Sequence, residues 1–261
     1  MILLGDAAKV LKDFNDGCID LIVTSPPYDN LRTYNGFVFD FESIARELYR
    51  ITTLGGVVVW IVNDQTIDGD KSGTSFKQAL YFKKIGFKLY DTMIYAKTGI
   101  CNPQPNKYHQ IFEYMFVFSK GLPKTFNGLM DRQNLHVGST HLVSTKRTGN
   151  KISRRKKYII SEYGLRYNIW TYSQGGKFEG GIADLGHPAV FPQQLAEDHI
   201  KSWSNEGDLV LDPFCGSGTT LKAAHQLNRK WIGIEISPKY VQLAKKRLTP
   251  YIQQQKLTTF A

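Results

Sequence analysis

The chain has 261 residues, of which 42% are hydrophobic and 21% charged, which indicates a globular protein and excludes a disordered or fibrous chain. The longest dense apolar run, residues 57–62, is far shorter than the roughly 20 residues that cross a bilayer, and the first residues lack the features of a secretory signal, so we expect a cytoplasmic protein without a membrane span. Lys and Arg number 33 against 23 acidic residues, and this net charge of +10 favours a polyanionic partner.

The first half of the chain alternates strand and helix patterns. The predicted elements are strands at 19–23 and 57–62, a helix at 41–51 between them, a helix at 76–85, and strands at 89–96 and 112–118. The first two strands are short β-branched apolar runs, typical of buried parallel strands. This order predicts an α/β fold.

Residues 121–184 differ from the rest of the chain, since their apolar periodicity fades and Gly, Ser, Thr and basic residues dominate. Between Lys120 and Gly180 there are twelve basic and three acidic residues, a net of +9 that is nearly the whole excess. We therefore predict a basic insertion rather than more sheet, with 1–120 and 185–261 forming one domain. Aromatic residues interleave with the cations, which suits either nucleic-acid contacts or a small core. The residues expected to bind phosphates are Lys146, Arg147, Lys151, Arg154, Arg155, Lys156 and Lys157, although such a run is equally typical of a solvated loop.

Regular patterns return after the insertion. They predict an apolar segment at 191–200, a strand at 209–211, a helix at 219–227, a strand at 231–234 and a final helix that begins at Pro238 with Ser237 as its N-cap. The cysteines Cys18, Cys101 and Cys215 form no C-x-x-C pair, and the histidines are dispersed. We therefore expect reduced thiols and no metal site.

Residues 210–220 read as a strand that enters a glycine turn and then a helix, at the place where open α/β sheets bind ligands. Asp212 offers a carboxylate at the strand end, and Glu235 ends the next strand, where an acid can bind both hydroxyls of a ribose. Position 221 is Leu where a dinucleotide motif needs its third glycine, and the ATP-binding motif is absent. The segment therefore favours a nucleoside ligand without requiring phosphates.

Residues 24–28 follow the first buried strand and carry few hydrogen-bond donors, because Pro26 and Pro27 have no N–H. Carbonyl groups and the Ser25 hydroxyl could accept both hydrogens of an exocyclic base amine, which would favour a pyramidal nitrogen with an available lone pair. Tyr28 would stack on the base. Taken alone, the segment could also be a proline turn with a buried tyrosine.

Together these segments resemble the S-adenosylmethionine-dependent amino-methyltransferases of DNA, in which D-P-F-x-G-S-G-T is the cofactor motif and [D/N/S]-P-P-[Y/F/W] holds the target amine. The order of the motifs is that of the family's permuted β group, in which the basic segment is the target-recognition region. The resemblance implies a Rossmann-like methyltransferase fold with a mainly parallel seven-stranded sheet flanked by helices, and S-adenosyl-L-methionine as the cofactor. It assigns catalytic roles to Ser25, Pro26, Pro27 and Tyr28.

The same resemblance gives the cofactor residues. The loop around the methionine portion would contain Asp212, Pro213, Phe214, Gly216, Ser217, Gly218, Thr219 and Thr220, and Glu235 would bind the ribose. The segment H-P-x-x-F-P would place His187, Phe191 and Pro192 against the methionine end of the cofactor. Asp6 would contact the adenine, or would be an ordinary loop aspartate.

The family methylates a base flipped out of double-stranded DNA. Methylation at cytosine C5 is excluded, because it needs a cysteine nucleophile, commonly in a Pro-Cys dipeptide, and the sequence has none. Ser25 favours cytosine N4 over adenine N6, and both remain open. The insertion is short for a specificity region, so a homodimer is considered, as is a cognate restriction endonuclease as partner. The alternative functions are methylation of RNA or of a protein amide, and a catalytically silent DNA-binding module.

Overall fold

The structure is a computed structural model that describes residues 1–27, 39–99, 105–148, 151–173 and 192–258. The chain divides into two compact units, which we describe separately. The first combines Met1–Asn127 with Asn168–Ala261, and the second is Gly128–Tyr167. Within the described ranges, no helix combines the length and apolar character needed to span a membrane.

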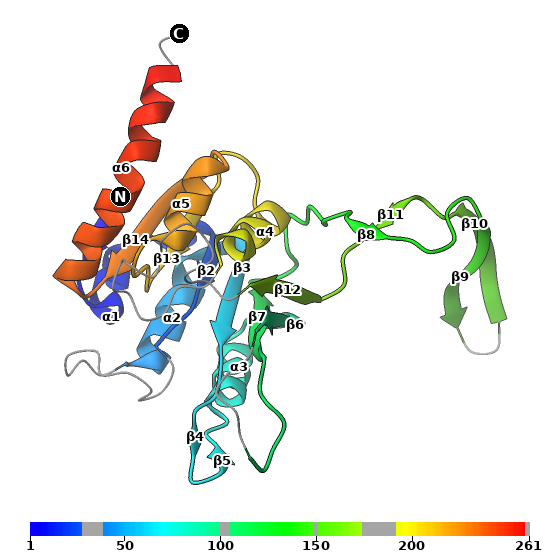
Figure 1. The fold of residues 1–261 in the computed structure, drawn as a ribbon, viewed down its shortest axis with the longest axis horizontal. Coiled ribbons are helices and arrows are strands. Elements are labelled where there is room, and N and C mark those ends of the chain that lie inside the picture. Colours follow the sequence, from blue (N-terminus) through cyan, green and yellow to red (C-terminus); the bar gives the residue numbers. More distant parts are fainter. Residues whose placement is uncertain (28–38, 100–104, 149–150, 174–191, 259–261) are drawn as a thin grey trace. The chain divides into compact units, whose positions relative to one another are not determined.

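The first unit is built on an eight-stranded sheet with the order β1-β14-β13-β2-β3-β7-β6-β12 (Figure 1). Strand β7 runs antiparallel to both of its neighbours, and the other pairs are parallel. The strands are β1 (Ile2–Leu4), β2 (Ile19–Thr24), β3 (Thr52–Val62), β6 (Lys88–Thr98), β7 (Phe112–Ser119), β12 (Ile169–Ser173), β13 (Leu209–Asp212) and β14 (Lys230–Glu235), and a separate pair is formed by β4 (Thr66–Ile67) and β5 (Asp70–Lys71). The predicted mainly parallel α/β fold is confirmed.

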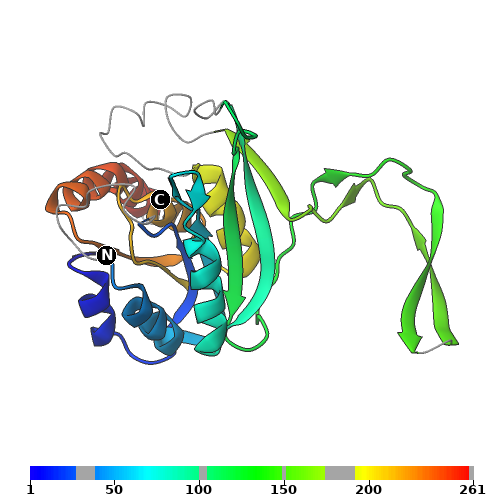
Figure 2. The same ribbon diagram turned by 90° about the horizontal axis from the view of Figure 1, so that it is seen from below.

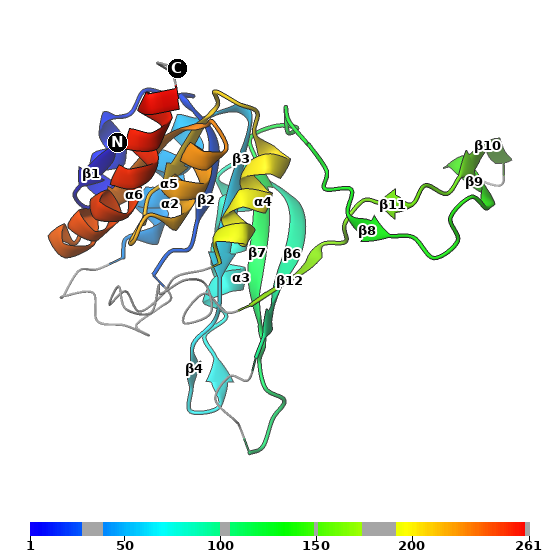
Figure 3. The same cartoon turned by 45° about the horizontal axis from the view of Figure 1, so that its top comes forward.

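Helices cover both faces of this sheet. The helices are α1 (Ala7–Val10), continued by the 3-10 turn η1 (Leu11–Asp13), α2 (Phe41–Ile51), α3 (Thr74–Lys84), α4 (Gln193–Trp203), α5 (Thr219–Gln226) and α6 (Pro238–Thr258). Figure 2 shows α1, α2 and α3 on one face, and Figure 3 shows α4, α5 and α6 side by side on the other. Strand β3 is buried on both faces from Gly55 to Val62, which explains its continuous apolar run.

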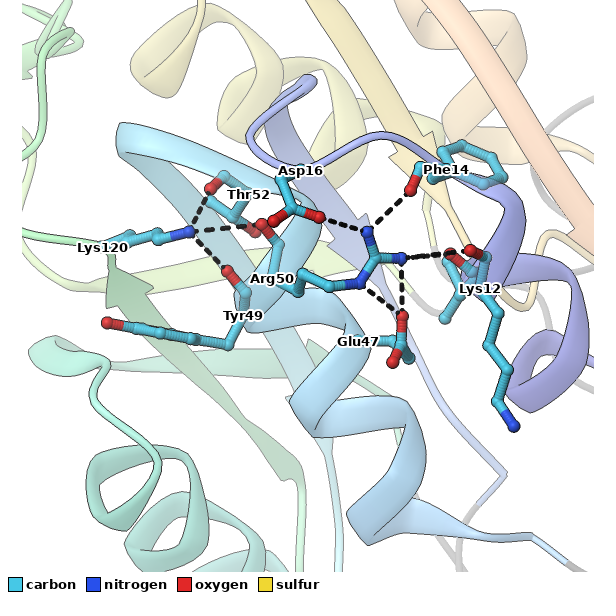
Figure 4. A network of polar contacts seen from close by, with 9 residues as sticks. Lys12, Phe14, Asp16, Glu47, Tyr49, Arg50, Thr52 and Lys120 are labelled. Atoms are coloured by element: carbon cyan, nitrogen blue, oxygen red, sulfur yellow. Dashed lines mark hydrogen bonds and ion pairs between the residues drawn. The ribbon is translucent and has the colours of Figure 1, made fainter.

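The C-terminal end of α2 is held by two cations (Figure 4). The Arg50 guanidinium donates to the carbonyl oxygens of Phe14 at 2.7 Å and Leu11 at 2.9 Å. The Lys120 ammonium donates to the carbonyl oxygens of Tyr49 at 2.8 Å and Thr52 at 2.9 Å. The Lys120 contacts satisfy carbonyl groups at the end of α2 and so help to fix the entry into β3, whereas Arg50 connects α2 to the η1 turn.

The sheet contains one strand more than the seven expected, because β12 returns from the insertion and pairs in parallel with β6. Its Trp170 is 6% exposed and packs on the ring of His199 in α4. Tyr172 also donates to Asp198 of α4 at 2.7 Å. The expectation that 121–184 adds nothing to the sheet is therefore wrong, since tertiary pairing makes Ile169–Ser173 a strand.

The second unit, Gly128–Tyr167, is shorter than the predicted insertion and consists of paired strands. Strand β8 (Arg132–Gln133) pairs with β11 (Tyr163–Gly164), and β9 (Thr140–Thr148) pairs with β10 (Lys151–Ile159), each antiparallel. Arg166 forms an ion pair with Asp131, and Arg132 donates to the carbonyl oxygen of Leu165 at 2.9 Å. These contacts connect the two chain segments that contain β8 and β11.

Candidate active site

The candidate site lies at the topological switch point of the sheet, where the strand order reverses. Strands β2 and β13 are parallel neighbours, and from them the chain continues outward in opposite directions, to β3 on one side and to β14 on the other. Ligands of open α/β sheets bind outside the carboxyl ends of the strands at such a switch point. The amine segment follows β2 and the glycine turn follows β13, so the fold brings the two predicted motifs together.

Asp212, at the end of β13, is the buried acid of this site, with 2% of its surface exposed. Its Oδ1 accepts hydrogen bonds from Thr24 Oγ1 at 2.7 Å and from the Phe214 backbone N–H at 3.1 Å. Burial raises the pKa of Asp212 from 3.8 to about 6, although the hydrogen bonds from Thr24, Thr220 and Phe214 oppose the shift. The site therefore holds a carboxylate whose charge a cationic ligand group would stabilise.

The turn after Asp212 depends on glycine. Gly216 and Gly218 have positive φ angles of 49° and 80°, which L side chains rarely adopt. A Cβ on Gly218 would lie 3.2 Å from the Cβ of Ala244 in α6, so the turn also packs closely against that helix. The turn thus requires glycine for its backbone conformation and, at Gly218, also for its packing against α6.

The loop is connected to the neighbouring strands. Thr220 Oγ1 donates to the carbonyl oxygen of Val23 in β2 at 3.2 Å, and the Cys215 N–H donates to the carbonyl oxygen of Ile234 in β14 at 2.9 Å. Pro213, Ser217 and Thr219 are buried, whereas Phe214 is half-buried and packs edge-on against Phe39 with ring centroids 5.5 Å apart. The predicted loop residues thus form one connected unit.

Glu235 ends β14 on the other side of the glycine turn. Its Oε2 accepts a hydrogen bond from the Gly216 N–H, and its Oε1 accepts one from the Ser237 N–H, both at 2.9 Å. Burial raises the pKa of this carboxyl above its usual value. Glu235 and Asp212 therefore flank the turn on adjacent parallel strands.

Asp6 follows β1, next to the end of β14. Its carboxylate accepts a hydrogen bond from the Ala8 N–H at 3.0 Å and so caps α1, while the neighbouring Gly5 N–H donates to the carbonyl oxygen of Glu235 at 3.0 Å. Asp6 thus acts as the N-cap of the first helix.

The amine segment begins at the buried Thr24, the last residue of β2. Pro26 is buried, and Ser25 and Pro27 are half-buried, at the same edge of the sheet as Asp212. Tyr28 lies outside the described residues, as do His187 and Phe191. Pro192 is buried directly before α4, and its carbonyl oxygen accepts a hydrogen bond from the Leu195 N–H at 3.1 Å.

Comparison with known proteins identifies the family. The model of the N6/N4 family, described as DNA methylase, matches residues 19–246 and thus includes both motifs of the site. The chain belongs to this family of DNA methylases.

Individual relatives agree with the family assignment. This DNA methylase is 54% identical over 245 residues to the orphan methyltransferase M.BamHII of Bacillus amyloliquefaciens, covering 92% of each chain. It is also similar to the structure of TTHA0409 from Thermus thermophilus in complex with S-adenosyl-L-methionine, at 26% identity, a TM-score of 0.64, and coverage of 96% and 95% of the two chains. The fold is shared with the PvuII DNA methyltransferase, which is cytosine-N4-specific, at 20% identity, a TM-score of 0.68, and coverage of 97% and 91%.

The seven predicted phosphate-binding residues of this methylase all lie on the β9–β10 hairpin. The register pairs Lys146 with Ser153 and Arg147 with Ile152 across the two strands. The side chain of Lys157, opposite Leu142, is exposed. From Thr140 to Ile159 the sequence contains no Asp or Glu. The hairpin is therefore a positively charged β-ribbon.

Two residues of the candidate site had no role assigned to them from the sequence. Thr24 links the amine segment to the buried acid, and Arg247 of α6 donates to the Thr219 hydroxyl at 2.9 Å. Thr24 could have been found because it directly precedes Ser25-Pro-Pro, whereas no local pattern marks Arg247. In the part of the chain that the structure describes, no group of three His, Cys, Asp or Glu residues could hold a metal ion.

Proposed function

We propose that this DNA methylase transfers a methyl group from S-adenosyl-L-methionine to the exocyclic N4 amine of a cytosine flipped out of duplex DNA. The observation that carries the proposal is the 2.7 Å hydrogen bond from Thr24 to Asp212, because it holds the amine segment against the cofactor loop. Adenine N6 is the alternative target, with the same use of the site.

The residues present fit this cofactor. Asp212 and Glu235 are buried carboxylates on either side of a turn that has no side chain at Gly216 and Gly218. The carboxylate of Asp212 would attract the cationic end of the cofactor, and Glu235 would accept hydrogen bonds from its ribose hydroxyls. When bound, S-adenosyl-L-methionine supplies an activated methyl group on a sulfonium centre. Asp6, His187, Phe191 and Pro192 are proposed as further contacts.

The amine segment would act on the base by hydrogen bonding. Ser25 and the carbonyl groups beside Pro26 and Pro27 would accept the hydrogens of the exocyclic amine, and neither proline offers a competing N–H donor. This arrangement would hold the nitrogen with its lone pair available and needs no covalent enzyme intermediate. Tyr28 would stack on the flipped base, so Tyr28→Ala should lower turnover, because such stacking contributes ~1–3 kcal/mol.

Ser25 favours cytosine as the target, since serine at this position is typical of the cytosine-N4 members of the family. The basic β9–β10 hairpin would hold the duplex as the target-recognition region, because seven cations without an acidic neighbour suit a phosphate backbone. A homodimer and a cognate restriction endonuclease are proposed as further partners.

The deciding experiment is mass spectrometry of digested duplex DNA after incubation with the protein and isotopically labelled S-adenosyl-L-methionine. We expect labelled N4-methylcytosine. Labelled N6-methyladenine would overturn the base assignment and keep the rest of the proposal. Parallel reactions with RNA and with peptides test the alternative substrates, and label on either of these but not on DNA would contradict the proposal.

A further inference from the structure

The start of α5 in the cofactor loop has backbone donors that the helix does not use. Helix α5 begins after Gly218, which has no side chain to cap it, and no side-chain hydrogen bond caps this end in the described part of the chain. The first N–H groups of a helix have no partner within the helix. The N–H groups of residues 219–221 can therefore bind a ligand, provided that nothing from the loop itself bonds to them.

Two hydroxyl groups of the loop could accept hydrogen bonds from these N–H groups. Ser and Thr side chains accept hydrogen bonds from backbone N–H groups two or three residues ahead in the chain. Ser217 could reach the N–H groups of residues 219 and 220, and Thr219 could reach that of residue 221. In the structure, Arg247 engages both hydroxyls: its Nη1 donates to Ser217 Oγ at 3.2 Å and to Thr219 Oγ1 at 2.9 Å.

Arg247 also holds the backbone of the loop, because the same Nη1 lies 3.3 Å from the carbonyl oxygen of Ser217. Helix α6, which carries Arg247, lies beside α5 (Figure 3) and presents Ala244, one turn earlier, to Gly218. Ser217 is 3% and Thr219 5% exposed, so these hydrogen bonds form with little competition from water. The position of the loop is thus set from α6.

We propose that Arg247 is a positioning residue for cofactor binding: it turns the Ser217 and Thr219 hydroxyls toward α6 and so leaves the first N–H groups of α5 to the cofactor. The inference rests on the proposed function, because it concerns the same loop and the same cofactor. It assigns a role in cofactor binding to Arg247, which lies outside the 212–220 motif, and this role is to control the conformation of two side chains in the loop.

The test compares Arg247→Met with Arg247→Lys, and with Lys246→Met as the control on an exposed position of the same helix. By calorimetry, Arg247→Met should raise the Kd of S-adenosyl-L-methionine about tenfold or more, with a parallel rise in KM and little change in kcat or in duplex affinity. Arg247→Lys should retain most of the affinity, because its ammonium group has three N–H donors that can bond to the same hydroxyls. Lys246→Met should behave as the wild type.

A double-mutant cycle separates positioning from general stabilisation. With Ser217→Ala and Thr219→Val already in place, Arg247→Met should raise the Kd much less than in the natural background, because no hydroxyl is left to bond to the helix start and only the contact with the Ser217 carbonyl oxygen is lost. The inference is wrong if Arg247→Met leaves the Kd unchanged in the natural background, or raises it equally in both backgrounds while lowering the Tm. An equal rise in the Kd in both backgrounds without a change in the Tm contradicts the inference as well.

Amide hydrogen exchange gives a readout that needs no cofactor. In the unliganded protein, Arg247→Met should slow exchange at residues 219–221, since the released hydroxyls then accept their hydrogen bonds, and the triple variant should lose this protection. Unchanged or faster exchange in Arg247→Met would contradict the inference. If the natural protein bound no S-adenosyl-L-methionine, the proposed function would be wrong. The hydrogen-exchange measurement would still test whether Arg247 controls the two hydroxyl groups.

Discussion

Thr24 and Asp212 are 188 residues apart in the chain, yet Thr24 Oγ1 donates a 2.7 Å hydrogen bond to Asp212 Oδ1 in the centre of the sheet. Thr24 is fully buried, and it is one of the hydrogen-bond donors that offset the cost of burying the carboxylate. This hydrogen bond therefore links the two halves of the proposed active site.

Replacing Thr24 by Val should weaken cofactor binding without removing the fold. The substitution keeps the side-chain shape and deletes a hydrogen bond to a charged group, which contributes about 1.5–3 kcal/mol. We expect the Kd of S-adenosyl-L-methionine to rise by one to two orders of magnitude, measured by calorimetry. Thr66→Val, on the exposed strand β4, is the matched control and should have no effect. An unchanged Kd for Thr24→Val would show that this contact does not support the cofactor loop.

The raised pKa of Asp212 makes both stability and binding depend on pH. Because its pKa is about 6 in the folded protein and 3.8 in the reference state, the difference corresponds to about 3 kcal/mol. In the unliganded protein this contribution to stability is present below pH 3.8 and is lost as the pH rises through about 6. The unfolding free energy of the natural protein should therefore fall between these pH values, and it should fall less in Asp212→Asn. Urea denaturation at each pH measures both.

Cofactor binding should show the opposite dependence on pH. A cationic ligand favours the ionised Asp212, so its affinity should fall as the pH drops through about 6, and binding near this pH should release protons. Calorimetry in two buffers with different ionisation enthalpies measures the protons released. Equal apparent enthalpies in both buffers would exclude a change in the protonation of Asp212 on binding.

The glycine turn offers a matched pair of substitutions. Gly218 and Gly69 have similar φ angles, 80° and 85°, but a Cβ on Gly218 would meet Ala244 at 3.2 Å while one on Gly69 would meet nothing within 4 Å. Both changes to Ala incur the left-handed backbone penalty, about 1–2 kcal/mol. Gly218→Ala should lower the unfolding free energy further and also reduce cofactor affinity, whereas Gly69→Ala should leave affinity unchanged. Equal effects on both measurements would mean that packing against α6 is unimportant.

Neutralising the hairpin should change DNA binding alone. If Lys156 and Lys157 contact phosphates, their replacement by Gln should reduce the slope of log affinity against log salt by about 0.9 for each contact. The same replacements at Lys83 and Lys84, on an exposed part of α3, serve as the control and should not alter the slope. Cofactor affinity should be unchanged throughout. A slope that stays constant for the hairpin variant would identify this run as a solvated surface.

Much of the fold could be predicted because local patterns determine it. The apolar runs around Val23 and Val58 and the helical spacing of Ile44 and Leu48 correspond to buried faces of β2, β3 and α2. Strand β12 could not be predicted in the same way, because Trp170 becomes buried only through pairing with β6 and packing on α4. The strands of the basic hairpin were missed because cations interrupt the alternation that marks a strand.

In the site, too, some residues could be predicted from local sequence patterns and others could not. Asp212, Gly218 and Glu235 could be placed from their positions at strand ends, since parallel strands bring their carboxyl ends to one edge. The contribution of Arg247 depends on how closely α6 approaches the loop, which is a tertiary relationship without a local signal.

The separation of the two motifs also has a consequence for the synthesis of the protein. At 5–20 residues per second, the ribosome adds the roughly 190 residues between Thr24 and Asp212 in about 10–40 s. During this time β2 lacks its neighbour β13, and the amine segment has no cofactor loop beside it. A nascent or prematurely terminated chain can therefore present the amine segment but cannot assemble the proposed methyl-transfer site, so activity should emerge only after translation has passed the cofactor loop.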